Sequence, residues 1–186
     1  MTKRNQSASL NGIELATVRL AQEQMRAEPE GNVSKPTYAA TVVWERGYRT
    51  RTQLPGGAVV HGDEPKVYGG EGEGATPQDL LLTAVGHCLS ATYVGGLSAA
   101  GITVRSLSVH VSGRVNFRAA YAVEQGHPGF ERIDVAVDID TDAPLESVEA
   151  LLAKLLPTAP IPDTILRPVP LEVQLRHAPA KQTTPE

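Results

Sequence analysis

The stretch "ATPQDLLLTAVGHCLSATYVGGLSAAGI", residues 75–102, is the most hydrophobic segment of the chain and holds its one cysteine, Cys88. Thr76 is a typical N-cap residue, and Asp79 three positions later completes a capping box. Gly101 is placed to end a helix in the left-handed conformation. The stretch therefore predicts one long helix between these signals, buried in the core of the protein.

The length of this apolar run would also suit a membrane span, which needs roughly 20 residues. The run contains His87 and three glycines, however, and no aromatic, lysine or arginine anchors flank it. Each glycine costs a helix about 1 kcal/mol relative to alanine, which is tolerable where a neighbouring element packs very close. We therefore expect a core helix packed against a sheet or a second helix, and no membrane partner.

Composition limits the remaining function classes. The chain has 186 residues, a net charge of -4 and only 4% aromatic residues, which speaks against nucleic acid as a partner. One cysteine cannot form an internal disulfide, and the N-terminus lacks the apolar core of a signal peptide. These features predict one globular domain in the reducing cytoplasm.

The segments before the long helix read as one helix and several strands. Asn11 is the expected cap of a first helix that ends at Pro29. Residues 36–54 alternate around Gly47 and predict a hairpin or a bulged strand, and residues 58–65 predict a further strand and a turn. The following "GGEGEGATP" lacks the lysine and hydroxyl residues of a phosphate loop, so we interpret it as a linker.

After the long helix, residues 103–117 and 130–142 alternate with period two and predict two strands. A second amphipathic helix follows, with Asp142 as its expected cap, and then a short helical turn and a last strand. Helices and antiparallel strands segregate along the chain, which predicts an α+β fold. The expected units are an N-terminal helical extension (1–34), the main domain (35–176) and a polar, disordered tail (177–186).

Cys88 has two interpretations at this point. A lone cysteine in an apolar helix is commonly a small core residue without chemistry. A reactive thiolate would need a cation from another segment, because Cys88 lies three turns past the helix N-terminus and adjacent His87 points about 100° away. The available cations are the arginines of the first strand region, Arg46, Arg49 and Arg51.

Metal and cofactor sites have little support in the sequence. The five histidines lie at positions 61, 87, 110, 127 and 177, without the HxH, HxxxH or CxxC spacing of a zinc site. We therefore expect neither a metal nor a cofactor.

The helix sequence resembles the signature of the OsmC/Ohr family of thiol-dependent peroxidases, a motif like P-x-E-x-L-L-x-A-x-x-x-C followed by a long helix that ends in Gly-Ile. The segments "DEP", "VRSLSVHVSG" and "APIPDTILRPVPLEV" fit the same family, and the opening residues look like those of a longer OsmC-like subgroup. The resemblance covers roughly residues 11–176.

The resemblance implies an OsmC-like fold with antiparallel sheets around the buried helix, and an intertwined homodimer with active sites at its interface. Cys88 matches the cysteine that attacks the hydroperoxide. Arg51 is the best match for the arginine that favours the thiolate, with Arg49 second. The carboxylate that holds this arginine falls at Gln78 or Asp79, which about 14–15 Å of straight helix separates from Cys88.

Two departures from the family pattern leave two hypotheses. Ala159 stands where the peroxidases have a second, resolving cysteine, and Gln78 cannot form an ion pair. The first hypothesis is a one-cysteine peroxidase that reduces organic hydroperoxides and is recycled by an external thiol reductant. The second is a catalytically reduced protein that binds a small apolar or acyl ligand at the dimer interface.

Overall fold

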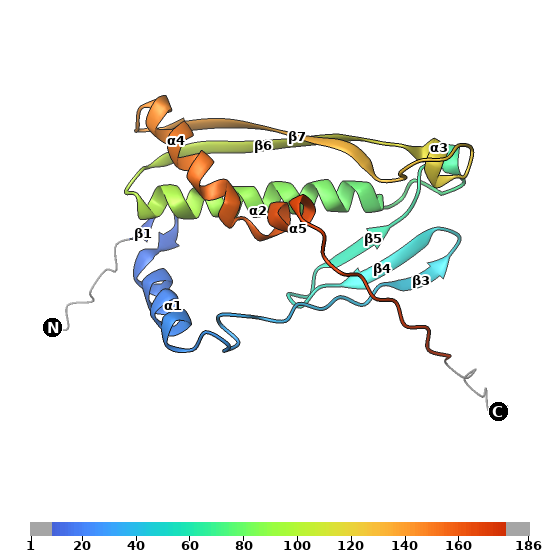
Figure 1. Cartoon of the computed structure of the whole chain (residues 1–186), viewed down its shortest axis with the longest axis horizontal. Coiled ribbons are helices and arrows are strands. Elements are labelled where there is room, and N and C mark those ends of the chain that lie inside the picture. The colour runs from blue at the N-terminus through green and yellow to red at the C-terminus, as the bar shows by residue number, and fades with distance from the viewer. Residues whose placement is uncertain (1–8, 178–186) are drawn as a thin grey trace.

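The computed structural model describes residues 9–177 and has the α+β architecture that the sequence predicts. The central helix α2 (Pro77–Ala99) lies along a long antiparallel ribbon of β6 (Val104–Val115) and β7 (Phe130–Thr141) (Figure 1). A second antiparallel sheet, made of β3 (Val43–Arg46), β4 (Arg49–Gln53) and β5 (Val59–Gly62), stands apart from this layer.

The predicted ends of α2 are confirmed. The Thr76 hydroxyl accepts a hydrogen bond from the Asp79 N–H at 3.1 Å, and the Asp79 carboxylate accepts one from the Thr76 N–H at 3.0 Å. Gly101 adopts a φ of 78°, and the Ile102 N–H bonds back to the Leu97 carbonyl at 2.9 Å. This is a Schellman ending, in which glycine avoids the strain of the left-handed conformation.

One stripe of α2 forms the centre of the core. Val85, Leu89, Tyr93 and Leu97 recur at every fourth position, and all four side chains are buried. The expected close packing at the helix glycines holds for two of the three. A Cβ at Gly86 would touch the Val111 side chain, and one at Gly96 would overlap Leu155, whereas Gly95 faces open space.

The predicted alternation of β6 and β7 is also confirmed. Val109 and Val111 on β6 and Val137 on β7 pack against the core cluster that contains Leu89. Aspartates on β7 point to the exposed face instead, where Asp138 and Asp140 pair with His110 and Arg105 of β6. The period-two pattern thus separates a core face from a solvated face.

The N-terminal part differs from the prediction at Asn11. This residue does not cap a helix: with Gly12 it makes the two-residue turn of a hairpin, β1 (Ser9–Leu10) and β2 (Ile13–Glu14), in which both turn residues have positive φ. The helix α1 (Leu15–Ala27) starts after the hairpin. The Asn11 side chain bonds the Ser98 hydroxyl and the Ile102 carbonyl, both at 2.9 Å, and so ties the hairpin to the end of α2.

The predicted hairpin and third strand form one sheet in the order β3 (Val43–Arg46), β4 (Arg49–Gln53) and β5 (Val59–Gly62). The turn at Gly47 has a φ of 50°, and the register shifts between Trp44 and Arg46, so hairpin and irregularity are both present. A short 3-10 turn, Lys66–Tyr68, leads toward α2.

The C-terminal elements are α3 (Phe117–Ala120) between the long strands, then α4 (Leu145–Leu155), the 3-10 turn Leu156–Thr158 and α5 (Pro160–Leu166). Asp142 does not cap α4: Pro144 stands at the cap, and the Asp142 carboxylate accepts the Thr103 N–H at 2.8 Å. The predicted last strand is wrong for the single chain, since residues 168–177 form neither helix nor strand. The expected disordered tail lies, from residue 178 on, outside the described residues.

The single chain leaves much of its apolar surface uncovered. Its accessible surface is 14838 Å², whereas a folded monomer of 19.8 kDa exposes roughly 8,600 Å². Residues 1–8 and 178–186 account for at most about 2,600 Å² of this difference, the area of an extended chain of that length. Leu171, Val173 and Leu175 near the C-terminus are 89%, 87% and 99% exposed. Within residues 9–177, no other element covers these three side chains.

By length and composition α2 would also suit a membrane span, as the core helices of soluble proteins commonly do. Here it packs against β6, α4 and α5. The fold therefore uses this helix as its core.

Candidate functional site

Cys88 is half-buried at the place where α2 meets the start of α5. Its Sγ accepts a hydrogen bond from the Ile161 backbone N–H at 3.4 Å. Ala159, at the N-cap of α5, is fully buried in the core cluster against which Cys88 packs. An N–H donor at the sulfur stabilises the charged thiolate more than the neutral thiol. Surroundings with this N–H donor therefore suit a thiolate better than purely apolar surroundings would.

His87 lies on a different face of α2, as predicted from its spacing. It is exposed and lines an open groove with Gly86, Ser90 and residues of β6. Cys88 instead faces α5 through the Ile161 N–H. His87 is therefore not placed to act as a base toward the Cys88 thiol.

An apolar cavity of about 210 Å³ is lined by Val85 and Leu89 of the buried stripe, which belong to the core cluster against which Cys88 also packs. Its walls come from α2, β7, the 3-10 turn Leu156–Thr158 and α5. Every lining residue is apolar: Val85, Leu89, Ile133, Val135, Leu156, Pro162, Ile165 and Leu166. A cavity of this kind suits the hydrocarbon part of a small ligand.

The β4 arginines do not contact Cys88 within the chain. The Arg51 Nε bonds the Glu45 carboxylate at 3.2 Å, and Arg49 binds the carboxylates of Glu71 and Glu73. The strand itself packs on β3 and β5, whereas α2 packs on β6, α4 and α5. A contact between either arginine and a Cys88 thiol would therefore require a second subunit.

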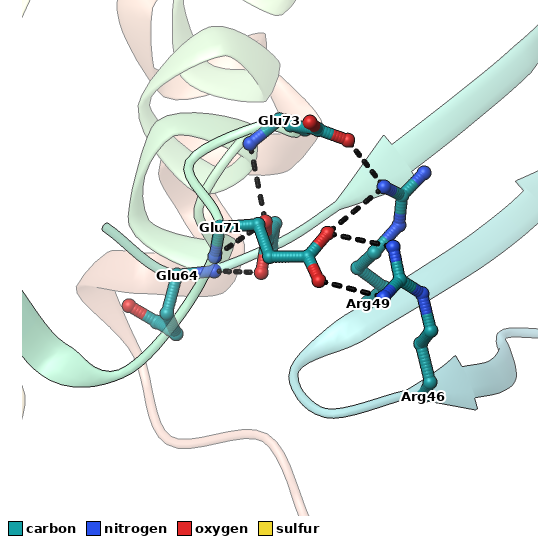
Figure 2. Close-up of polar contacts among 6 residues, drawn as sticks. Arg46, Arg49, Glu64, Glu71 and Glu73 are labelled. Carbon is teal, nitrogen blue, oxygen red and sulfur yellow. Dashed lines mark hydrogen bonds and ion pairs between the residues drawn. The ribbon is translucent and has the colours of Figure 1, made fainter. Parts of the chain in front are cut away.

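The acidic glycine loop is not a free linker, which corrects the prediction from composition. Figure 2 shows Glu71 between Arg46 and Arg49, with Glu73 beside Arg49. The Asp63 carboxylate holds the loop from inside by accepting the backbone N–H groups of Glu64, Glu71 and Glu73 at 2.8, 3.1 and 3.1 Å. Sequence reasoning missed these acids. Their signal was two glutamates two positions apart, preceded by the strand arginines Arg46 and Arg49 that could pair with them.

Asp63 is well suited to this task. Its side chain is buried, and the donated N–H groups, that of Glu73 first, hold the pKa of the carboxyl below its usual value. The carboxylate therefore stays charged and keeps its three donors well into the acidic range.

Gln78 and Asp79 contact neither arginine. The carboxylate of Asp79 is engaged at the helix cap, where the Thr76 hydroxyl is the main reason that the pKa of Asp79 is lowered. The half-buried Gln78 lines a separate cavity near Tyr68 and Phe117 at the start of α2. Because α2 is one unbroken helix, neither residue reaches Cys88 in its own chain.

A metal site is not apparent in the described part of the chain. No group of three His, Cys, Asp or Glu side chains among residues 9–177 is arranged to hold an ion. The acids of the glycine loop are engaged with arginine and backbone N–H groups.

Comparison with known proteins gives one family. The model of the family described as OsmC-like protein matches residues 70–174. A search of curated proteins found no match. Among solved structures, an OsmC-like protein from Mycoplasma pneumoniae has 19% identity and a TM-score of 0.61, over 71% of this chain and 89% of its own.

Two other similar structures carry names that refer to organic hydroperoxides. The organic hydroperoxide resistance protein OsmC from Legionella pneumophila has 20% identity and a TM-score of 0.52, over 70% of this chain and 91% of its own. A putative organic hydroperoxide resistance protein from Vibrio cholerae, with captopril in one of its active sites, has 16% identity and a TM-score of 0.52, over 70% and 86%. At these identities the likeness establishes the fold.

Proposed function

The chain belongs to the OsmC-like protein family, and on that premise we propose that it is a one-cysteine peroxidase that reduces organic hydroperoxides. The observation that carries the proposal is the position of Cys88. The residue is half-buried, packs against the core cluster whose Val85 and Leu89 also line the apolar cavity, and its sulfur accepts the Ile161 N–H at 3.4 Å. Neighbours in fold named for hydroperoxide resistance support the same substrate class.

In the proposed reaction the Cys88 thiolate attacks the terminal oxygen of the hydroperoxide. The O–O bond breaks, the sulfur is oxidised to a sulfenic acid, and the alkoxide takes a proton and leaves as an alcohol. An external thiol then forms a mixed disulfide with Cys88 and releases water, and a second external thiol restores the Cys88 thiol. The chain needs this external reductant because Ala159 offers no second sulfur. A reducing compartment such as the cytoplasm would supply it.

We propose that the working unit is a homodimer. The uncovered apolar segment at Leu171–Leu175 and the exposed α1 support a covering second copy. In such a dimer the sheet that carries Arg49 and Arg51 would approach the partner's Cys88, and one of these arginines would stabilise its thiolate.

A second candidate function, ligand binding without chemistry, is supported by the absence of a second cysteine from the sequence. With alanine at position 159 and the arginines engaged by glutamates, the chain would be a binding protein for a small apolar or acyl ligand. The cavity between α2, β7 and α5 would then hold the ligand without chemistry.

Trapping the sulfenic acid separates the two functions. One equivalent of cumene hydroperoxide in the presence of dimedone should add a single dimedone to the intact protein, at Cys88, because it is the only cysteine. Without dimedone or a reductant, excess hydroperoxide should carry the same sulfur on to the sulfinic acid. Intact-protein mass spectrometry measures both products. If Cys88 stays unmodified in the folded dimer, the peroxidase proposal is wrong and the binding-protein proposal is favoured.

The dimer has its own test. Light scattering at micromolar concentration should give about twice the chain mass of 19.8 kDa. Val173→Asp places a charge on a side chain that is exposed in the single chain, so it should leave the monomer folded and shift the mass toward one copy. Gln174→Glu is the control: it adds the same charge at the neighbouring position without removing an apolar side chain, and this variant should remain dimeric. A monomeric wild type would contradict the dimer.

A further inference from the structure

We propose that Glu71 and Glu73, set in place by the buried Asp63, position Arg49 as the arginine that stabilises the reactive thiolate. The inference rests on the proposed function and makes it more specific. It selects Arg49 over Arg51, and it assigns the arginine-holding carboxylates to the glycine loop rather than to the start of α2.

The two arginines differ in how firmly they are held. The Arg49 side chain is 25% exposed and bound by two carboxylates. Arg51 is 43% exposed and, among residues 9–177, pairs with the one carboxylate of Glu45. An exposed single pair holds a long side chain weakly, because screening and side-chain entropy offset its attraction. A guanidinium between two carboxylates has lost most of that freedom already, so stabilising a thiolate would cost it little further ordering.

Arg49 also keeps donors available. Both glutamates bind the same nitrogen, Nη1. Within residues 9–177, Nε and Nη2 of Arg49 have no hydrogen-bond partner, so they are free to donate to a sulfur or a peroxide oxygen. In Arg51 it is Nε that is engaged, by Glu45. Figure 2 shows the far side of the Arg49 guanidinium turned away from the glutamates.

The loop is built to present these two carboxylates. The Asp63 carboxylate accepts hydrogen bonds from the backbone N–H groups of Glu71 and Glu73. The side chains of these two glutamates extend toward the sheet that carries the arginines. The Gly72 N–H bonds the Glu64 carbonyl at 3.1 Å, and the Gly70 N–H bonds the Pro65 carbonyl at 3.2 Å. Glu71 also grips Arg46 through both of its oxygens, at 2.8 and 2.9 Å. Two arginines and two glutamates thus form one network.

This network supplies what the start of α2 lacks. Gln78 is neutral and Asp79 is engaged at the helix cap, so neither provides a carboxylate to the sheet. Glu71 and Glu73 lie only a few residues earlier in the chain and already hold the arginine. The geometry therefore points to a transfer of this role from the helix to the loop.

The test is the pH profile of Cys88 alkylation by iodoacetamide in the full chain. Glu71→Gln with Glu73→Gln keeps the side-chain shapes but releases Arg49, and Arg49→Ala removes the guanidinium. Both should move the midpoint of the profile upward by about one pH unit, equivalent to a tenfold lower rate below the midpoint. Glu45→Gln, which breaks the matched pair on the same sheet, should leave the profile in place.

The direction of the shift identifies the mechanism. If the glutamates acted only as negative charges, their removal would favour the thiolate and move the midpoint downward. A downward shift, an unchanged profile, or a larger loss in Arg51→Ala than in Arg49→Ala would each overturn the inference. Failure of the proposed function is a separate result: Cys88 would then form no sulfenic acid with hydroperoxide, whatever its alkylation profile.

Discussion

Ala159→Cys is expected to turn Cys88 from a sulfur that over-oxidises into one half of an internal disulfide. Ala159 is fully buried in the cluster against which Cys88 packs, and the N–H of Ile161, two residues on, donates to the Cys88 sulfur at 3.4 Å. A new thiol there would attack the sulfenic acid, form the S–S bond and release water. One equivalent of hydroperoxide should then yield mostly disulfide, and with excess hydroperoxide the yield of sulfinic acid should be at least tenfold lower than in the wild type.

Intact mass under non-reducing conditions gives the result directly, since the disulfide is two hydrogens lighter than the dithiol. Thr158→Cys is the matched control: it adds the same thiol one residue earlier, on an exposed side chain, and should still over-oxidise at Cys88. Turnover with a dithiol reductant should also rise in Ala159→Cys. Equal over-oxidation in both variants would show that position 159 is not within reach of the sulfenic acid.

The parts of the fold that the sequence predicts well are those with local causes. The ends of α2 follow from Thr76, Asp79 and Gly101, whose backbone bonds are satisfied within a few residues. The alternation in β6 and β7 marks one face of each strand as apolar, and that face packs on α2. Such signals depend little on the rest of the chain.

The missed features depend on distant or external partners. Asparagine is a residue type favoured at helix N-caps, but the Asn11 side chain forms hydrogen bonds with Ser98 and Ile102, some ninety residues away. Its neighbour Gly12 carried the hairpin signal that the prediction overlooked. Alternation in the C-terminal segment predicts a strand, yet a strand forms only where another strand pairs with it.

The candidate site divides in the same way. Cys88 could be found from its place in the helix motif, and the position of His87 on another face of α2 followed from helix geometry. The sequence could not decide between Arg49 and Arg51, because the two residues are two positions apart on one strand and so point to the same face of the sheet. What separates them is the fold of the acidic loop around Asp63, and composition alone suggested a linker there.

Gly70→Ala is expected to break that loop and with it the hold on Arg49. A Cβ at Gly70 would overlap the Glu64 carbonyl, a backbone atom that cannot turn aside as a side chain can. The loop must therefore shift, and the N–H of Glu71, the next residue, would leave Asp63. We expect Cys88 to form its sulfenic acid at least tenfold more slowly, with the same upward shift of the alkylation profile as in Arg49→Ala.

The loop itself can be followed with a glutamate-specific protease, which should cleave after Glu71 and Glu73 much faster in Gly70→Ala than in the wild type. Gly56→Ala is the matched control, because Gly56 lies in the connection between β4 and β5 of the same sheet and a Cβ there meets nothing within 4 Å. That variant should keep the wild-type oxidation rate and loop protection, with stability equal or slightly higher. Rapid cleavage of Gly70→Ala together with wild-type oxidation would mean that the loop is a scaffold alone. Slow oxidation in both glycine variants would mean that the whole sheet, rather than the Asp63 loop, sets the reactivity of Cys88.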